Sequence, residues 1–170
     1  KPGLSSSKNL GNSTYTPYFH VISDDKDITI KPRLFTNNKF VLQNEYRQVT
    51  ENSFTVADFS LAKGHNSTIY DKNDTRTHLF VNNKIDLGLD DYQSSKLEIN
   101  YEKTSNDNYL KLFNLESPLL LKSNDVLESK IQLDLQHQNY DLMASVEVYE
   151  TLDGLNSDRY EYVLPSYNFS

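Results

Sequence analysis

The sequence predicts an all-β fold, an antiparallel meander, on three observations. Residues 27–34, 96–102 and 126–137 carry mostly aliphatic or Tyr side chains on one parity and mostly charged or other polar side chains on the other. Side chains of a strand point alternately to opposite faces, so this period of two predicts strands with one apolar and one polar face. Clusters of Asn, Asp, Ser and Gly recur at intervals of roughly 10–20 residues, as hairpin turns do. No segment clearly predicts a helix.

The turn clusters bound the predicted strands, and a short strand near 3–8 precedes the others. In order, the strands cover residues 13–22, 27–35, 39–49, 53–62, 76–87, 95–104, 126–137, 140–150 and 159–168. The strand at 53–62 has apolar residues on both parities, which a bulge or a buried corner would explain. Residues 109–115 predict at most one helical turn before Pro118.

One apolar face can be followed through most of these strands. It is expected to carry Tyr15, Pro17, Phe19 and Val21; Phe40, Leu42 and Tyr46; Leu79, Val81, Ile85 and Leu87; and Leu142, Ala144, Val146 and Val148. The opposite face is charged along its whole length. It therefore faces either bulk water or a wet lumen, and these two settings imply different functions.

The composition favours a sheet whose apolar face is covered by something other than its own chain, such as lipid. Hydrophobic residues make up only 36% of the 170 residues, and the mean hydropathy is -0.67. The 12 Tyr residues suit half-buried strands and also membrane interfaces. No apolar run approaches the roughly 18 residues of a membrane-spanning helix, but a barrel strand needs only about 9–11 alternating residues.

Charge and motif content exclude several function classes. The net charge is -7, and Lys and Arg never cluster in runs of more than two, which argues against nucleic-acid binding. The absence of Cys excludes disulfides and thiolate metal sites. The four histidines lack metal-ligand spacing, and the acidic loop at 71–74 lacks the Gly and distal Glu of a calcium loop. We therefore expect no enzyme activity, no cofactor and no metal.

Two prolines, Pro17 and Pro32, fall inside neighbouring predicted strands rather than in turns. Proline donates no backbone hydrogen bond, so it is confined to strand edges, first positions and bulges. Two adjacent strands that each carry one would pair weakly at that level. From the residues alone, this indicates either an edge blunted against aggregation or a seam that opens.

Short motifs follow one another along most of the chain. They are Pro17-Tyr18-Phe19, Asp27 to Arg33, Glu45-Tyr46-Arg47, Asp58-Phe59, Arg76 to Phe80, Asn100-Tyr101 and Ser105 to Tyr109. The first three match the patterns P-Y-[YF], D-x-T-[LI]-x-P-[RH] and E-[FY]-R. In this order, and with the two prolines fifteen residues apart, the set resembles the start of the barrel in the outer-membrane LPS-assembly protein family (LptD, also called OstA or Imp).

The resemblance implies an antiparallel barrel in the bacterial cell outer membrane of a Gram-negative organism that passes lipopolysaccharide to the outer leaflet. In that family the first strands pair weakly with the last and form a lateral gate, which makes Pro17 and Pro32 gate residues. The implied partners are lipopolysaccharide, a plug lipoprotein of the translocon (LptE-like) in the lumen, outer-membrane lipid, and a periplasmic LPS-bridge protein that acts through a further domain. By parity, the residues expected to face the lumen are Lys31, Arg33, Glu45, Arg47, Glu98, Glu102, Glu128, Lys130 and Asp134.

We expect residues 1–170 to be a single fragment of an outer-membrane β-barrel domain, a partial transmembrane β-barrel of about nine to ten strands, without the periplasmic domain and the remaining strands. Two alternatives stay open. A soluble secreted β-sandwich that binds glycans through a Tyr-rich face would need a second apolar-faced sheet. An outer-membrane barrel of another function, such as a porin or receptor, has no reason to place prolines in two adjacent strands.

Overall fold

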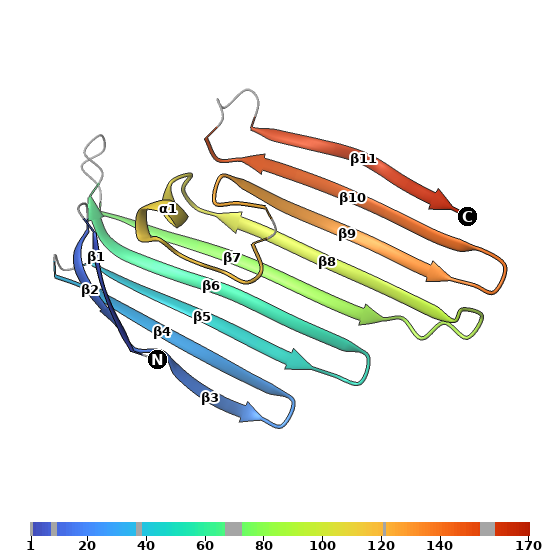
Figure 1. The fold of residues 1–170 in the computed structure, drawn as a ribbon, viewed down its shortest axis with the longest axis horizontal. Helices are drawn as coiled ribbons and strands as arrows, with labels where there is room; N and C mark the ends of the chain where they lie inside the picture. Colours follow the sequence, from blue (N-terminus) through green and yellow to red (C-terminus); the bar gives the residue numbers. More distant parts are fainter. Residues whose placement is uncertain (1, 8–9, 37–38, 67–72, 121, 154–158) are drawn as a thin grey trace.

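The computed structural model describes the chain except residues 1, 8–9, 37–38, 67–72, 121 and 154–158, and it shows one broad antiparallel sheet (Figure 1). Its strands are β1 (Gly3–Ser7), β2 (Gly11–Tyr15), β3 (Tyr18–Ser23), β4 (Lys26–Phe35), β5 (Phe40–Val49), β6 (Ser53–Asn66), β7 (Asn73–Asp86), β8 (Ser94–Thr104), β9 (Val126–Gln136), β10 (Asp141–Thr151) and β11 (Tyr160–Phe169). A five-residue helix, α1 (Tyr109–Phe113), lies in the connection from β8 to β9. No helix of the described chain is long and apolar enough to cross a membrane.

The strands follow one another in chain order, as a meander requires, and the sheet is not closed. The order is β1-β2-β4-β5-β6-β7-β8-β9-β10-β11, and β3 also pairs with β4. The predicted all-β antiparallel meander is thereby confirmed. The described residues form eleven strands rather than nine to ten, because the predicted strand at 13–22 is two strands, β2 and β3, separated by Thr16 and Pro17.

Cross-strand register gives the sheet two chemically different faces. Glu45, Asp58, Phe80 and Glu102 form one row across β5 to β8, on the side that we call the charged face. A row on the other side, the apolar face, runs through Ile85, Leu97, Leu133 and Ala144. The register confirms the apolar parity predicted for β5, β7 and β10.

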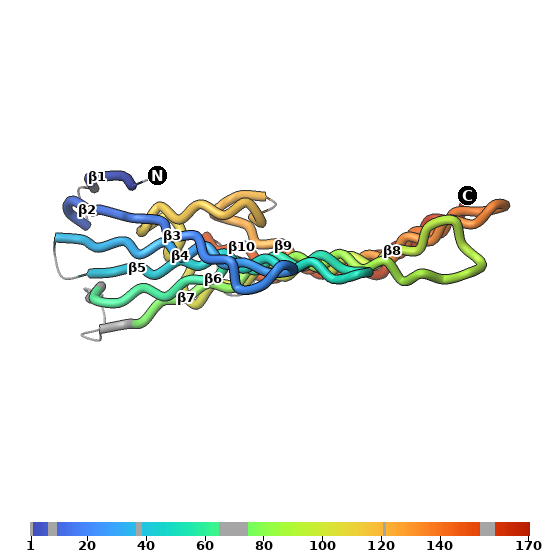
Figure 2. Tube along the Cα trace, turned by 90° about the horizontal axis from the view of Figure 1, so that it is seen from below, coloured from blue at the N-terminus to red at the C-terminus, as the bar shows by residue number. Residues whose placement is uncertain are grey.

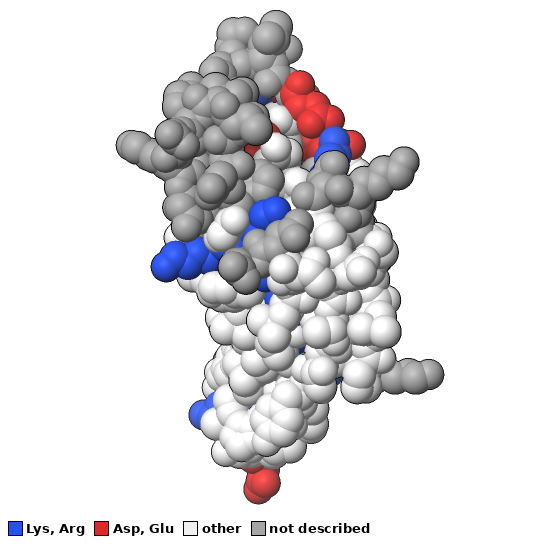
Figure 3. Space-filling view, turned by 90° about the vertical axis from the view of Figure 1, so that its left-hand side faces the viewer, with Lys and Arg blue, Asp and Glu red and all other residues white. Residues whose placement is uncertain are grey.

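The parity predicted for the first strand is wrong. Tyr15 pairs with Arg33, and Phe19 pairs with Thr29, so both lie on the charged face; Pro17 and Val21 follow the same parity. β3 has apolar or aromatic residues on both parities and is largely exposed, so its sequence carries no information about faces. Only the ladder with β4 decides which side each residue takes. From the N-terminal edge, the lower part of the molecule, where β3 lies, shows mostly uncharged residues (Figure 3).

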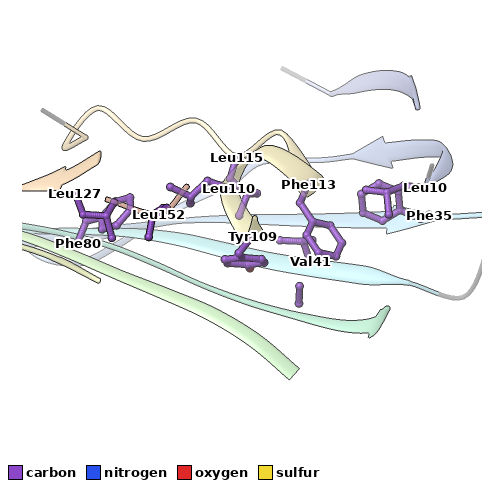
Figure 4. Packing of buried hydrophobic residues seen from close by; sticks show 11 residues of the cluster. Leu10, Phe35, Val41, Phe80, Tyr109, Leu110, Phe113, Leu115, Leu127 and Leu152 are labelled. Carbon is purple, nitrogen blue, oxygen red and sulfur yellow. The ribbon is translucent and has the colours of Figure 1, made fainter. Parts of the chain in front are cut away.

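The buried apolar core lies on the charged face, at one end of the sheet. Residues 105–120 and 122–125 pass over this face there, while the other half of the sheet is a thin single layer (Figure 2). The core consists of Leu10, Phe35, Val41, Ala62, Phe80, Tyr109, Leu110, Phe113, Leu115, Leu127 and Leu152 (Figure 4). Of β6, only Ala62 belongs to this core; Phe54 and Val56, which give the strand its mixed parity, lie on the charged face outside the core, and Phe54 is 40% exposed.

The apolar face stays open to its surroundings. Leu34, Ile131 and Val146 are 60%, 53% and 45% exposed, although each belongs to the regular alternation of its strand. The described residues form one sheet, so the second sheet that a β-sandwich needs is missing from them. Contiguous exposed apolar surface of this kind marks a contact with lipid or with another protein.

Candidate functional site

The two predicted gate prolines lie at the same level of the sheet, with Pro32 inside β4 and Pro17 in the break between β2 and β3, not inside the strand predicted for it. Tyr15 pairs with Arg33 and Tyr18 pairs with Ile30, with the same offset, so the ladder continues in register on both sides of the break. Across the break, the amide of Thr16 donates to the carbonyl of Pro32 at 3.3 Å. The return bond from residue 32 to Thr16 has no donor, because Pro32 lacks an N–H. We call this level, residues 16–17 against 31–32, the seam.

The prolines differ in the direction of the hydrogen bond that each removes. Pro32 shares a hydrogen-bonded pair with Thr16, so its missing donor weakens the ladder between β4 and the β2–β3 edge. Pro17 is the next residue, so its backbone nitrogen points the opposite way, toward the outer edge of the sheet. β1 covers that edge only as far as Tyr15, which pairs with Gly3, and within the described residues no strand pairs with the outer edge of β3.

The structure places all nine residues predicted to face a lumen on the charged face. They are Lys31, Arg33, Glu45, Arg47, Glu98, Glu102, Glu128, Lys130 and Asp134. They do not gather at one point; they spread from β4 to β9. Charge alternates across the strands, so most of these side chains find partners on the same face.

Cross-strand ion pairs cover this face from one end to the other. Lys31 lies 3.6 Å from Glu45, and Lys130 lies 2.9 Å from Glu147. Toward the edge, the Arg47 guanidinium lies 2.9 Å from Asp27. Opposite charges on neighbouring strands, directly across the ladder or diagonal to each other, stabilise a sheet modestly when they are exposed. The face is thus polar without a strong excess of either sign.

A buried hydrogen-bond chain anchors residues 105–125 to the sheet. The Tyr109 hydroxyl lies 2.7 Å from Ser60 Oγ, which lies 2.6 Å from His78 Nδ1. His78 Nε2 is 3.2 Å from Asp58 Oδ1. Each of these four side chains is less than 5% exposed. Asp58, His78 and Ser60 stand in the order of a hydrolase triad, but they are buried and capped by Tyr109, so the array holds the segment in place.

Further bonds fix the same segment along its length. Gln43 Nε2 donates to both Asp58 carboxylate oxygens at 3.1 and 3.0 Å and to the Glu116 carbonyl at 3.0 Å. Arg33 donates to the Phe113 carbonyl at 2.8 Å. The segment is therefore tied to β4, β5, β6 and β7 through side chains of the charged face.

Titration behaviour reflects this burial and pairing. Burial raises the pKa of the Tyr109 phenol to about 12, because the ionised phenolate would lose its hydration. Hydrogen bonds to Asp107 and to Glu150 raise the pKa of the Arg159 guanidinium above its ordinary value. Bonds to Asp125 and Asp153 raise the pKa of the exposed Lys111 ammonium.

Sequence reasoning missed the anchoring residues. His78 lies on the predicted polar parity of its strand and Asp58 lies in the strand of mixed parity, and nothing in their spacing indicates that they meet. Tyr109 ends another of the short motifs, Ser105 to Tyr109. Its contact with Ser60 could not be predicted, because the two residues are far apart in the sequence. Within the described residues, no group of three His, Cys, Asp or Glu side chains could hold a metal ion. The side chains of the acidic loop at 71–74 lie outside the described residues.

Comparison with known proteins gives distant relatives of one kind. No protein-family model matches the chain. It is 28% identical over 164 residues to the LPS-assembly protein LptD of Psychrobacter arcticus, covering 92% of this chain and 17% of that protein. The LPS-assembly protein LptD of Psychrobacter cryohalolentis is also 28% identical over 164 residues, covering 92% of this chain and 15% of that protein. That of Pseudomonas putida is 26% identical over 160 residues, or 88% of this chain and 16% of that protein. The chain thus spans only a small part of the length of these relatives.

Proposed function

We propose that this chain is part of an outer-membrane translocon, a transmembrane β-barrel that inserts lipopolysaccharide into the outer leaflet through a lateral gate. The observation that carries the proposal is the two-faced open sheet with a broken ladder at its edge. The chain acts as a transporter component and not as an enzyme. The name of the relatives, LPS-assembly protein, supports lipopolysaccharide as the transported lipid.

The apolar face supports a membrane setting. Strands β4 to β11 have 10 to 14 residues, and a tilted barrel strand needs about 9–11 to cross the hydrocarbon core. Aliphatic side chains line this face, and their exposure to water would be unfavourable. Covering them with acyl chains returns about 25 cal/mol for each Å² removed from water.

The end of the sheet that holds the β7–β8 and β9–β10 connections carries an aromatic cluster of the kind found at membrane interfaces. His137 stacks on Tyr140 at 4.6 Å between ring centroids, and Tyr140 stacks on Phe169 at 5.2 Å. Tyr92 joins them through a hydroxyl contact of 3.2 Å with Tyr140. Aromatic girdles flank the apolar band of outer-membrane barrels, because such rings have an apolar body and a polar edge.

The seam supports a lateral route for an amphiphile. Separating two strands inside a bilayer exposes unpaired backbone groups, each of which costs several kcal/mol in hydrocarbon. At the seam one of these bonds is already absent, so opening there exposes fewer such groups than opening elsewhere. Head groups would stay on the charged face while acyl chains pass between the strands.

The remaining partners belong to the same proposal. The uncovered part of the charged face would contact a plug lipoprotein in the lumen. A periplasmic bridge protein would deliver lipid through a domain outside this chain, and outer-membrane lipid would surround the apolar face. A porin or receptor barrel would share the two-faced sheet, but neither would need a ladder weakened by two prolines.

The test replaces both prolines by alanine in the natural full-length protein. Pro32→Ala would restore the missing donor to Thr16, and Pro17→Ala would allow pairing on the outer edge. We expect lipopolysaccharide at the cell surface, labelled on intact cells after a pulse, to fall several-fold. Pro118→Ala is the matched control, since Pro118 lies outside the ladders. Unchanged surface lipopolysaccharide in the double variant, at equal protein level, would remove the gate role.

A further inference from the structure

A cavity of about 380 Å³ opens beside the seam on the charged face. Tyr15 and Pro17 form its edge-strand wall, and Lys31 and Arg33 of β4 form its floor. Asn114 and Glu116 close it from the side of the 105–125 segment. A cavity of this size accommodates a small ligand or the head group of a larger one.

Arg33 enters this cavity as a cation without an acidic partner. Its Nε donates to Ser13 Oγ at 3.0 Å, Nη2 to Ser5 Oγ at 2.6 Å and Nη1 to the Phe113 carbonyl at 2.8 Å. All three acceptors are neutral, and none of the ion pairs of the described chain includes Arg33. A guanidinium has five N–H donors, so about two remain for another acceptor.

The three bonds also hold the guanidinium in one place. A planar, pre-oriented fork with free N–H groups matches the geometry of a phosphate or carboxylate. Lys31 adds a second positive charge, shared with Glu45 at 3.6 Å. Glu116 is the acidic group of the cavity wall; it is exposed and forms no ion pair with Arg33. The unpaired positive charge of the cavity is therefore that of Arg33.

We infer that this cavity binds a phosphate monoester carried on the head group of an amphiphile, with Arg33 as the principal contact and Lys31 as the second cation. The inference rests on the proposed function and specifies where the transported lipid is held. The location argues for a lipid rather than a free anion. Pro17 lines the cavity, while Pro32 pairs with Leu42 on the apolar face at the same level. A head group at Arg33 therefore lies next to the break through which its acyl chains would reach the apolar face.

The test measures binding of two lipids to the full-length protein in detergent: bisphosphorylated lipid A and the same lipid without phosphates. Arg33→Gln should reduce affinity for the phosphorylated lipid about tenfold or more, because a hydrogen-bonded charge pair is lost. Its affinity for the phosphate-free lipid should stay unchanged. Arg33→Lys should recover part of the loss, since it keeps the charge without the fork. Lys84→Gln, a cation of the same face outside the cavity, is the matched control and should bind like the wild type.

Each outcome bears on the inference. Equal binding of phosphorylated lipid by the wild type and Arg33→Gln would overturn it, and so would an equal loss for both lipids, which would indicate a structural role. Inorganic phosphate that competes as strongly as the phosphorylated lipid would overturn the lipid assignment and indicate a free-anion site. If the wild type bound neither lipid, the proposed function would fail as well. If the wild type and Arg33→Gln bound the phosphorylated lipid equally well while export still depended on the prolines, the phosphate site at Arg33 would be refuted and the proposed function would stand.

Discussion

Replacing Ile131 by Arg should destabilise the protein in a bilayer by about 2–4 kcal/mol, the cost of a basic side chain on the lipid face near the midplane. Ile131 lies in the middle of β9, pairs with Ile99 and Val146 on the apolar face, and is 53% exposed. If that face met water, the same change at so exposed a site would alter stability by only about 0.5 kcal/mol. The two environments thus predict clearly different magnitudes.

The assay folds the full-length protein into phospholipid vesicles and follows unfolding in urea. Gln132→Arg is the matched control, because the neighbouring residue lies on the charged face. Gln132 donates to Asp134 at 2.8 Å and pairs with Glu98, so a new cation would meet carboxylates there. We expect the control to unfold like the wild type. An Ile131→Arg variant that unfolds at the same urea concentration as the wild type would refute a lipid-facing position.

Two further predictions concern the segment that covers the charged face. The pKa of Tyr109 is about 12 in the folded protein against an ordinary 10. The stability that follows from this difference is therefore fully present below pH 10 and is lost as the pH rises toward 12. The loss in the free energy of unfolding is about 3 kcal/mol at most. Tyr109→Phe should lower the free energy of unfolding by about 1 kcal/mol at pH 8, through loss of the bond to Ser60, and should flatten the decline above pH 10 in urea titrations. Arg159→Gln should speed amide exchange in residues 105–113, measured by mass spectrometry, because Arg159 joins Asp107 to Glu150 through contacts of 2.7 Å. Exchange equal to the wild type would contradict that link.

The strands and their faces were predictable because the signal is local. A period of two survives wherever one face of a strand is uniformly apolar and the other uniformly charged, as in β9 with Ile131 and Leu133 against Lys130 and Asp134. Turn residues then mark the ends. The helical turn at 109–115 was also visible, and the structure has α1 there.

The parts that could not be predicted depend on contacts distant in sequence. Nothing in residues 105–125 indicates that they fold back over the charged face, since that depends on Tyr109 reaching Ser60 from 49 positions away. The face of β3 was predicted incorrectly for the same reason. Phe19 and Tyr18 are equally apolar, and only pairing with β4 places one on each side.

The seam shows how one structural device can act on two ladders. Pro32 removes a donor that would point toward Thr16, whereas the nitrogen of Pro17 points away from β4, toward the edge that β1 leaves uncovered. Replacing Pro32 alone would strengthen the junction inside the described sheet and leave the outer edge unchanged. Replacing Pro17 alone would allow pairing at the outer edge and leave the junction inside the described sheet unchanged. A strand edge with weakened pairing on both sides can separate on either side, so a single replacement would leave one route open. For that reason the double replacement, and not either single one, tests whether this edge serves as the exit.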